Sequence, residues 1–327
     1  MPPTVSFVIP TFRRPDALRA TLDAVLGVEY PAELCQVIVV DNAPDAATET
    51  VVRSYSGLAI PVRYEVESRG GSATARNHGA RVADGELLIF CDDDIVVEPS
   101  HVRRHLQARE QHGDGLVSGN WHFAPETLAA LMRTPFGRYR IALDQRFRGS
   151  PDGVQLDENR WQVEALAACN LMISRALFWD VGGFDEDFPF AGVEDREFSM
   201  RATESGARLI RDDGIRLLHN DQTITLEQFC LREERSARTI AVLARKHPES
   251  ERSRTFAAVN GPIALRDPFG VTVKKLLKVM LETPPMMRLL HAGVRASERL
   301  GLGEPAMGRL YSGLVGIHIF RGFRSEL

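Results

Sequence analysis

Short apolar runs alternate with stretches of helical periodicity through the first half of the chain. Four of the runs have the length and composition of buried strands, namely residues 5–10, 37–40, 62–66 and 87–91. Between them, apolar residues recur at helical spacing over residues 15–26, and a second helix is expected over residues 72–82. This alternation predicts βαβ units, and hence an α/β fold with a mostly parallel sheet flanked by helices.

The second half of the chain is less regular. We expect strands over residues 115–119, 166–173, 208–210 and 215–218, and helices over residues 174–182, 194–205 and 226–246. Residues 121–163 show weak periodicity and many arginines, while the tail beyond residue 261 has further helical stretches. The chain is therefore expected to divide into an α/β domain over residues 1–222 and a helical C-terminal region over residues 223–327.

Three of the predicted strands end in polar residues. Thr11 and Arg13 follow the first strand, Asp41 follows the second, and residues 92–94, all aspartate, follow the fourth. In an open parallel sheet, ligands bind at the carboxyl ends of the strands. Three adjacent carboxylates repel one another, and a hard divalent cation that also binds diphosphate oxygens would offset this repulsion. The alternative is a solvated acidic turn, with Asp94 as a helix cap, but the buried run before the aspartates favours a metal site.

A glycine-containing turn, residues 68–71, precedes the helix predicted over residues 72–82. Its backbone N–H groups and the positive end of the helix could face a phosphate. The sequence matches neither GxGxxG nor GxxxxGK[ST], so a dinucleotide site or a P-loop is disfavoured. Arg76 and Asn77 lie one or two turns into the helix, where both side chains could point toward the same cleft. The alternative is that Arg76 pairs with a carboxylate at the surface, and both interpretations stay open.

A second acidic pair, Glu194 and Asp195, follows a glycine- and aromatic-rich loop over residues 182–192. Acidic residues are common in the first turn of a helix, but a flexible loop could bring a carboxylate over a bound substrate as general base. His219 follows the last short strand. Its imidazole either makes a structural hydrogen bond or completes a metal shell begun by Asp94.

Seven short motifs, in this order and spacing, resemble the family-2 glycosyltransferases of GT-A fold. They are IPTFR (9–13), VVDN (39–42), ARNHG (75–79), FCDDD (90–94), GGFD (182–185), ED (194–195) and His219. The resemblance covers about two-thirds of the chain. It implies a Rossmann-like sheet and an inverting, metal-dependent transferase that moves a sugar from a nucleotide-diphosphate sugar, with a UDP-sugar as first choice, to a hydroxyl acceptor such as a small natural product or a glycan.

The resemblance also implies roles for individual residues. Asp94 and His219 would ligate Mn²⁺ or Mg²⁺, and Asp195 would be the catalytic base with Glu194 in support. The implied donor-binding residues are Pro10, Thr11, Arg13, Asp41, Arg76, Asp92 and Asp93. Residues 1–120 would bind the nucleotide sugar and residues 121–222 would hold the acceptor-binding and catalytic part, with Trp121 and Asn170 as candidates for acceptor contacts.

Other function classes compete with this interpretation. A nucleotidyltransferase acting on sugar phosphates also uses carboxylates and a metal, but its N-terminal loop is rich in glycine and lysine, and residues 10–15 contain neither. A phosphatase would be expected to carry its nucleophilic aspartate after the first strand. A non-catalytic protein that binds a sugar nucleotide stays open, although the intact acidic motifs argue against it.

Composition changes this picture little. A net charge of -4 gives no general reason to bind nucleic acid. The four cysteines are far apart and lack metal-ligand spacing, so we expect reduced core thiols in a cytoplasmic protein. No signal peptide is evident, and no apolar run reaches the roughly twenty residues of a membrane span. The helical tail is expected to pack on the catalytic domain, while a peripheral membrane contact or a homodimer surface stays open.

Overall fold

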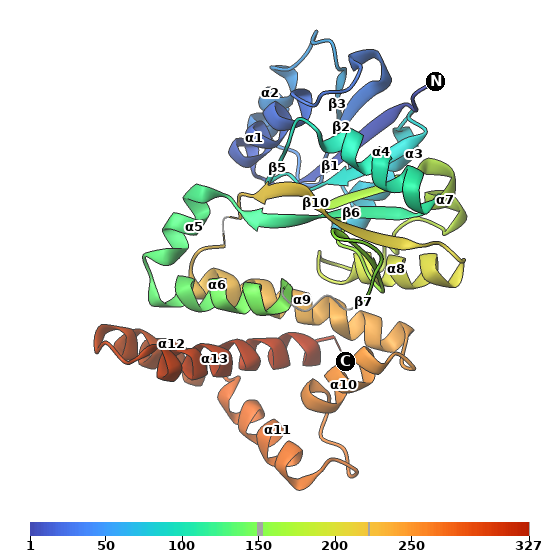
Figure 1. Ribbon diagram of the computed structural model, residues 1–327. Coiled ribbons are helices and arrows are strands. Elements are labelled where there is room, and N and C mark those ends of the chain that lie inside the picture. The colour runs from blue at the N-terminus through green and yellow to red at the C-terminus, as the bar shows by residue number, and fades with distance from the viewer. Residues whose placement is uncertain (149–152, 222, 327) are drawn as a thin grey trace. The chain divides into compact units, whose positions relative to one another are not determined.

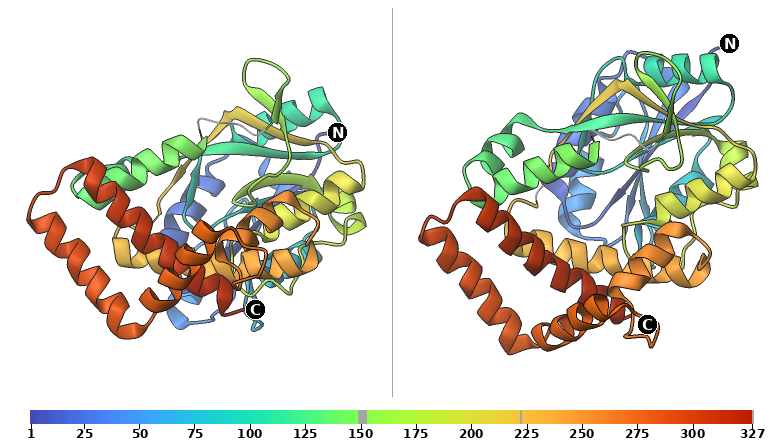
Figure 2. Two further views of the ribbon diagram at one scale, coloured as in Figure 1. Left: turned by 90° about the horizontal axis from the view of Figure 1, so that it is seen from below. Right: turned by 60° about the horizontal axis from the view of Figure 1, so that its bottom comes forward.

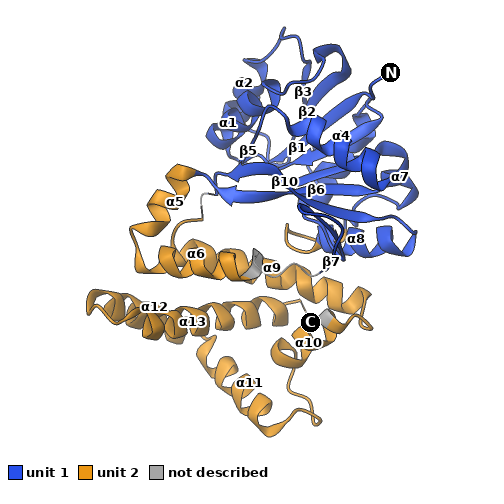
Figure 3. Cartoon of the chain, in the orientation of Figure 1, with its two compact units in different colours: residues 1–124, 150–186, 194–221 blue, residues 125–149, 187–193, 222–327 orange. Residues whose placement is uncertain are grey.

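The computed structural model describes residues 1–148, 153–221 and 223–326, which fall into two compact units (Figure 3). Unit 1 comprises Met1–Ala124, Ser150–Glu186 and Glu194–Asp221. Unit 2 comprises Pro125–Gly149, Asp187–Val193 and Gln222–Leu327. Two segments from the first two-thirds of the chain thus group with the C-terminal helices, and the functional boundary expected at residue 222 stays a prediction.

Unit 1 is built on one mixed sheet (Figure 1). Its described residues form ten strands in the order β3-β2-β1-β4-β9-β6-β10-β8-β7, with β5 paired to β10. The strands are β1 Val5–Thr11, β2 Cys35–Asp41, β3 Val62–Val66, β4 Leu87–Cys91, β5 Ile95–Val97, β6 Leu116–Phe123, β7 Gly153–Gln155, β8 Arg160–Val163, β9 Asn170–Ser174 and β10 Leu209–His219. Strands β3, β2, β1 and β4 are parallel to one another, whereas β9 runs antiparallel to β4 and β6. The predicted α/β fold is confirmed, and its second half is mixed.

Helices cover both faces of the parallel half of the sheet. They are α1 Pro15–Leu26, α2 Ala46–Arg53, α3 Ser72–Val82, α4 His101–His112, α7 Arg175–Asp180 and α8 Glu194–Glu204. Side chains alternate along β1: Phe7 and Ile9 pack with α1, α2 and α4, while Val8 packs with α3, α7 and α8. Because both faces of β1, β2 and β4 are buried, these strands are apolar at most positions, which made them visible in the sequence.

Helix α3 approaches the sheet closely because of one glycine. A Cβ atom at Gly79 would collide with the side chain of Val8 on β1. The helix begins after Gly71, which has a φ of 118° that L side chains rarely adopt. The Gly71 N–H donates to Oδ1 of Asn42 at 2.9 Å. The start and the middle of α3 are thereby fixed against the parallel strands.

Unit 2 consists mainly of helices (Figures 1 and 2). They are α5 Pro125–Met132, α6 Pro135–Arg148, α9 Leu226–Lys246, α10 Glu251–Asn260, α11 Phe269–Leu281, α12 Pro284–Arg299 and α13 Glu304–Arg324. Helices α9 and α13 pack backbone to backbone at Gly322, where a Cβ atom would overlap the carbonyl of Glu234. The buried Glu234 carboxylate lies 2.7 Å from Nδ1 of His318 and accepts from Nε of Arg321 at 3.0 Å. Within the described residues, no helix is both long enough and apolar enough to cross a bilayer.

Several elements were not predicted or were predicted incompletely. Helix α4 buries His101 and His105, so its inner face lacks the apolar spacing that marks a helix in a sequence. Helix α2 and strand β5 also went unpredicted. The segment 121–163 contains the end of β6, helices α5 and α6, and a hairpin of β7 and β8. The two short strands expected over residues 208–210 and 215–218 are one strand, β10, with a register shift in its middle.

The cysteines lie as their apolar settings predicted. Cys35, Cys91 and Cys230 are buried, Cys169 is partly buried, and all four are free thiols. Burial raises the pKa of Cys35 to about 11 and that of Cys230 to about 12. These thiols are therefore protonated packing residues at neutral pH rather than nucleophiles.

Candidate active site

The carboxyl ends of β1, β2 and β4 meet at one edge of the sheet in unit 1. Thr11 ends β1 in register with Asp41, which ends β2, and Asp92 directly follows β4. Strands β2 and β3 lie on one side of β1, and β4 lies on the other. The chain order reverses at this point, so the edge is where an open α/β sheet forms its ligand-binding crevice.

Asp93 fastens the turn after β4 to the end of β1. Its side chain is buried; Oδ2 accepts a hydrogen bond from Oγ1 of Thr11 at 2.8 Å, and Oδ1 accepts from Arg14 at 3.3 Å. Burial raises the pKa of Asp93 to about 6, although the neighbouring Arg14 charge opposes this shift. Each oxygen of Asp93 thus already has a protein partner, as does the hydroxyl of Thr11.

Asp94 and His219 come together although 125 positions separate them in the sequence. Antiparallel pairing of β5 with β10 places His219 opposite Ile95, and Nε2 of His219 lies 3.1 Å from Oδ1 of Asp94. Burial lowers the pKa of His219, but the Asp94 carboxylate more than offsets it, so the net shift is upward. The other Asp94 oxygen accepts from Arg14 at 2.9 Å. Sequence reasoning missed Arg14, whose only signal was its place beside the selected Arg13.

Arg76 joins the two acidic motifs. Its guanidinium is buried and pairs with Asp92 at 2.7 Å through one terminal nitrogen and with Glu194 at 2.8 Å through the other. Ser72 donates to the same Glu194 oxygen at 2.7 Å. Arg76 thus pairs with carboxylates, as the surface alternative held, but its side chain is buried, and its contact with a nucleotide stays a prediction.

Asp195 stands beside this bridge in the first turn of α8. Oδ1 accepts from the backbone N–H of Arg196 at 2.7 Å, and Oδ2 accepts from that of Ala168 at 3.4 Å. Burial raises the pKa of Asp195 to about 7, the Glu194 charge adds to the shift, and Arg76 opposes it. The side chain keeps some solvent exposure. A reachable carboxylate with a pKa near neutrality has the properties of a general base.

Asp41 is fully buried at the end of β2. Its Oδ2 accepts from the Tyr64 hydroxyl at 2.9 Å, and its Oδ1 accepts from the N–H of Ala43 at 3.0 Å. Burial, and then the bond to Asp41, raise the pKa of Tyr64. Asp41 therefore anchors the loop after β2, and its contact with a donor stays a prediction.

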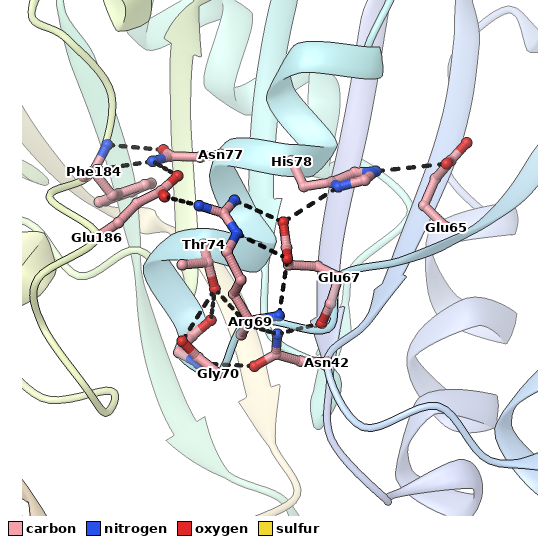
Figure 4. Close-up of polar contacts among 11 residues, drawn as sticks. Asn42, Glu65, Glu67, Arg69, Gly70, Thr74, Asn77, His78, Phe184 and Glu186 are labelled. Carbon is pink, nitrogen blue, oxygen red and sulfur yellow. Dashed lines mark hydrogen bonds and ion pairs between the residues drawn. The ribbon is translucent and has the colours of Figure 1, made fainter.

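A second polar network ties the glycine turn after β3 to the loop after α7 (Figure 4). Arg69 donates to both oxygens of Glu67, at 3.1 and 2.8 Å, and to Glu186 at 2.6 Å. Asn77 of α3 donates to the carbonyl of Phe184 at 2.8 Å and accepts from its N–H at 2.9 Å. The bonds from Arg69 lower the pKa of Glu67 to about 2. The sequence had singled out Asn77 as a side chain that could point toward the cleft, but it assigned no role to Arg69, Glu67 or Glu186.

The remaining selected residues have different settings. Pro10 lies in β1 directly before Thr11, and Arg13 is exposed with a φ of 54°, which is uncommon outside glycine. Trp121 of β6 is half-buried, and its ring meets that of His219 edge-on at 4.9 Å between centroids. Asn170 is only 1% exposed and its Oδ1 lies 2.9 Å from Nε2 of His105. Direct contact with an acceptor is therefore not favoured for Asn170, because its side chain is enclosed in the core.

Two family models match the chain. The model of glycosyl transferase family 2 matches residues 6–182, which is more than half of the sequence. The model described as the N-terminal domain of galactosyltransferase matches residues 154–222. Together they cover the sheet edge, the glycine-rich loop, the Glu194–Asp195 pair and His219.

Curated relatives are similar over the same part of the chain. Validoxylamine A glucosyltransferase of Streptomyces hygroscopicus subsp. jinggangensis is 32% identical over 228 residues, which are 62% of this chain and 52% of the relative. Glycosyltransferase AglE of Haloferax volcanii is 27% identical over 209 residues, 63% of this chain and 64% of the relative. The chain spans about half the length of the first of these relatives and less than two-thirds of the second.

Solved structures share the fold at low sequence identity. Mannosyltransferase PcManGT from Pyrobaculum calidifontis, in complex with GDP-Man and Mn²⁺, superposes with a TM-score of 0.61 at 17% identity, covering 98% of this chain and 87% of that one. GalNAc-T7 with UDP, GalNAc and Mn²⁺ gives 0.55 at 15% identity, covering 84% and 54%. The sheet of unit 1 therefore has the arrangement found in GT-A proteins.

Proposed function

The chain belongs to glycosyl transferase family 2 and is a glycosyltransferase of GT-A fold, and on this premise we propose an inverting transfer from a nucleotide-diphosphate sugar to a hydroxyl acceptor. The Arg76 bridge is the observation that carries the proposal. It links Asp92, at the sheet edge where the donor would lie, to Glu194, which adjoins Asp195. Asp195 is a solvent-reachable carboxylate with a raised pKa. One such base suits an inverting transfer, in which the acceptor hydroxyl displaces the diphosphate in a single step. Family membership favours this over the nucleotidyltransferase, phosphatase and non-catalytic alternatives.

We assign metal binding to Asp94 and His219, for which Mn²⁺ and Mg²⁺ are both candidates. A carboxylate oxygen and an imidazole nitrogen converge here, since Oδ1 of Asp94 and Nε2 of His219 are separated by 3.1 Å, and both atom types are ligands of divalent metals. Among the described residues, no group of three or more His, Cys, Asp or Glu side chains could hold an ion. The remaining ligands would therefore be diphosphate oxygens and water. The ion would stabilise the negative charge of the leaving diphosphate.

Asp195 is the proposed base. The acceptor hydroxyl gives its proton to Asp195 as its oxygen forms a bond to the anomeric carbon. On the opposite side of that carbon, the bond to the diphosphate oxygen breaks and its electron pair leaves with the diphosphate, which inverts the configuration. Glu194 stays paired with Arg76 and Ser72, and its charge helps to keep the pKa of Asp195 raised.

Donor and acceptor contacts are proposed for different parts of unit 1. The donor-binding part is proposed for residues 1–120, at the edge formed by Pro10, Thr11, Asp41 and the turn after β4, with the exposed Arg13 as a cation open to a phosphate or base. The acceptor-binding and catalytic part is proposed for residues 121–222, with Trp121 beside His219 as the ring for an acceptor to contact. Asn170 would act indirectly, by holding β9 against α4 through His105.

Thermal stability in the presence of nucleotide sugars tests the donor site. UDP-, GDP- and dTDP-sugars are added with Mn²⁺, with Mg²⁺ or with a chelator, and UDP-sugars are expected to raise Tm most when metal is present. A ligand at 100 times its Kd should stabilise by about 2.7 kcal/mol. Stabilisation by none of the three classes would overturn the donor site. Slow metal-dependent hydrolysis of the stabilising sugar nucleotide, without acceptor, would then identify the transferred sugar.

A further inference from the structure

Helix α11 of unit 2 places two of its three lysines, Lys275 and Lys278, toward the protein and several large apolar side chains toward solvent. Lys275 is only 1% exposed; its Nζ pairs with Asp267 at 2.8 Å and donates to the carbonyl of Pro262 at 2.9 Å. Lys278 donates to Oδ1 of Asn260 at 3.0 Å. A helix on the surface of a globular protein normally buries its apolar stripe and exposes its charges. The polarity of α11 is the reverse of this arrangement.

The exposed stripe of α11 is continuous. It consists of Phe269, Val273, Leu276, Leu277 and Met280, of which Phe269 is 86% and Met280 is 67% exposed. These positions fall within an arc of about 100° on a helical wheel. Ile263 and Leu265, in the loop before the helix, are also exposed. Figures 1 and 2 show α11 at the outer edge of unit 2. The five residues of the stripe and the two exposed loop residues are together called the α11 surface.

Positive charge flanks the α11 surface. Residues 259–281 contain four basic residues, Arg266, Lys274, Lys275 and Lys278, and one acidic residue, Asp267, in a chain whose net charge is -4. Asp267 pairs with Lys275 on the inner side. Arg266 and Lys274 are exposed. Large apolar side chains flanked by exposed cations are typical of helices that lie in the headgroup region of a membrane.

We propose that the α11 surface binds the face of an anionic lipid bilayer. The helix has 13 residues, or about 20 Å, so it is suited to lying in the interface plane. A second copy of the chain is the competing occupant. A two-fold dimer through this surface would bring together two copies of the same patch, each with the exposed cations Arg266 and Lys274, whereas anionic headgroups offer the opposite charge. The inference is independent of the sugar donor and of the acceptor.

Vesicle co-sedimentation of the full chain tests the apolar part of the proposal. Vesicles of phosphatidylcholine alone are compared with vesicles that also contain phosphatidylglycerol. The double variant Phe269→Glu with Leu276→Glu should weaken binding to the anionic vesicles by roughly a hundredfold or more. The reason is that two large apolar side chains are no longer transferred from water into the membrane. Leu231→Glu on α9 is the matched control, since Leu231 is as exposed as Leu276, and it should bind like the wild type. Circular dichroism and Tm verify that each variant is folded.

Charge variants test the role of the cations, and light scattering measures the oligomeric state in solution. Arg266→Gln with Lys274→Gln should weaken binding to anionic vesicles by roughly thirtyfold and leave the weaker binding to phosphatidylcholine unchanged. Phe269→Trp should show a blue-shifted emission on binding. The proposal is overturned if the wild type fails to sediment with anionic vesicles, or if the Phe269→Glu and Leu276→Glu pair binds them normally. It is also overturned if light scattering shows a dimer that this pair dissociates, because the occupant is then a second copy.

Discussion

The two acidic clusters of unit 1 differ in what neutralises them. After β4, Asp93 and Asp94 both lie against Arg14, and His219 adds a second partner to Asp94. At the start of α8, Arg76 pairs with Glu194. The oxygens of Asp195 accept bonds from backbone N–H groups, and among the described residues no side-chain cation forms an ion pair with Asp195.

This difference separates binding from proton transfer. A carboxylate that lies against two cationic groups, as Asp94 does, is suited to binding a metal or a phosphate-bearing ligand. Asp93 has only Arg14 as a cationic partner, and burial still raises its pKa to about 6. A carboxylate that is desolvated beside another negative charge has its pKa moved toward neutrality, where it can take up a proton and release it again. The same residue type is thus suited to two tasks by its neighbours alone.

The largest expected effect is that of Asp195→Asn. Removing the base should lower kcat by about 10³-fold while donor binding, followed by thermal shift, is unchanged. Because the folded protein raises the pKa of Asp195 above its unfolded value, ionised Asp195 costs stability at neutral pH. The variant should therefore have a higher Tm than the wild type at pH 8.

A matched change on the same helix, Glu204→Gln at the end of α8, should alter neither property. Persistent turnover in Asp195→Asn would remove Asp195 as the base. A fall in both activity and Tm would point to misfolding instead of lost chemistry.

Asp94→Ala should have the next largest effect. Without this carboxylate, only His219 of the two proposed protein ligands would be left to hold the metal. Turnover at saturating donor should therefore fall by about 10²-fold. The residual activity should no longer respond to Mn²⁺ or to a chelator. Asp180→Asn, an exposed change at the end of α7, serves as the control. Turnover of Asp94→Ala that still depends on added metal would place the ion elsewhere.

The third prediction is the pH dependence of kcat/KM, which should change by about tenfold per pH unit on the acid side. Asp195 must be ionised to accept a proton, and its pKa is about 7. The value of kcat/KM should therefore be constant at high pH and fall by about tenfold for each unit below 7. Steady-state kinetics between pH 5 and 9 measure this profile; a decline that begins only near pH 4 would mean that Asp195 titrates as an ordinary aspartate.

Arg76→Lys tests whether the bridge tunes Asp195. A lysine keeps the positive charge but cannot reach Asp92 and Glu194 with two nitrogens at once. We expect kcat to fall by roughly tenfold and the inflection of the pH profile to move upward, because Arg76 opposes the raised pKa of Asp195. Arg81→Lys, later on α3, is the control. An unchanged pH profile would show that the bridge only supports the fold.

Asn77→Ala should have the smallest effect. It removes both hydrogen bonds to the backbone of Phe184, loosening the loop that precedes α8. We expect a loss of severalfold in kcat with little change in KM. Asn77→Asp keeps an acceptor for the Phe184 N–H but loses the donor. Its kcat should fall at least as far as that of Asn77→Ala, because the new carboxylate lies beside that of Glu186. Equal losses in kcat and donor affinity would instead place Asn77 at the donor.

Much of the fold was predictable because the parallel strands are buried on both faces. The runs ending at Thr11, Asp41 and Cys91 appear in the structure with nearly the expected bounds. Helix α4 was not predictable in the same way, since its buried face carries His101 and His105. In the mixed half, β6, β9 and β10 were predicted as strands, but their directions were not, because a strand's direction depends on connections that no local pattern encodes.

The candidate site was predictable as a list of residues and much less as a set of contacts. Strand ends and motif order selected Asp92, Arg76 and Glu194, but nothing in the sequence said that one guanidinium would join two carboxylates that lie 16 and 118 positions away from it. For a related reason Arg14 was missed, and the partners of Asn77 were not foreseen. Their importance comes from partners on other elements, not from their sequence neighbours.

The Arg76 bridge also limits how this chain can be altered or recombined. Its three residues come from α3, from the turn after β4 and from α8, so a crossover anywhere between residues 76 and 194 draws them from different parents. A chimera then keeps the bridge only if both parents supply compatible partners. Variation at Asp92 or Glu194 is consequently expected to be accompanied by variation at Arg76, and donor specificity should be transplanted with all three residues together.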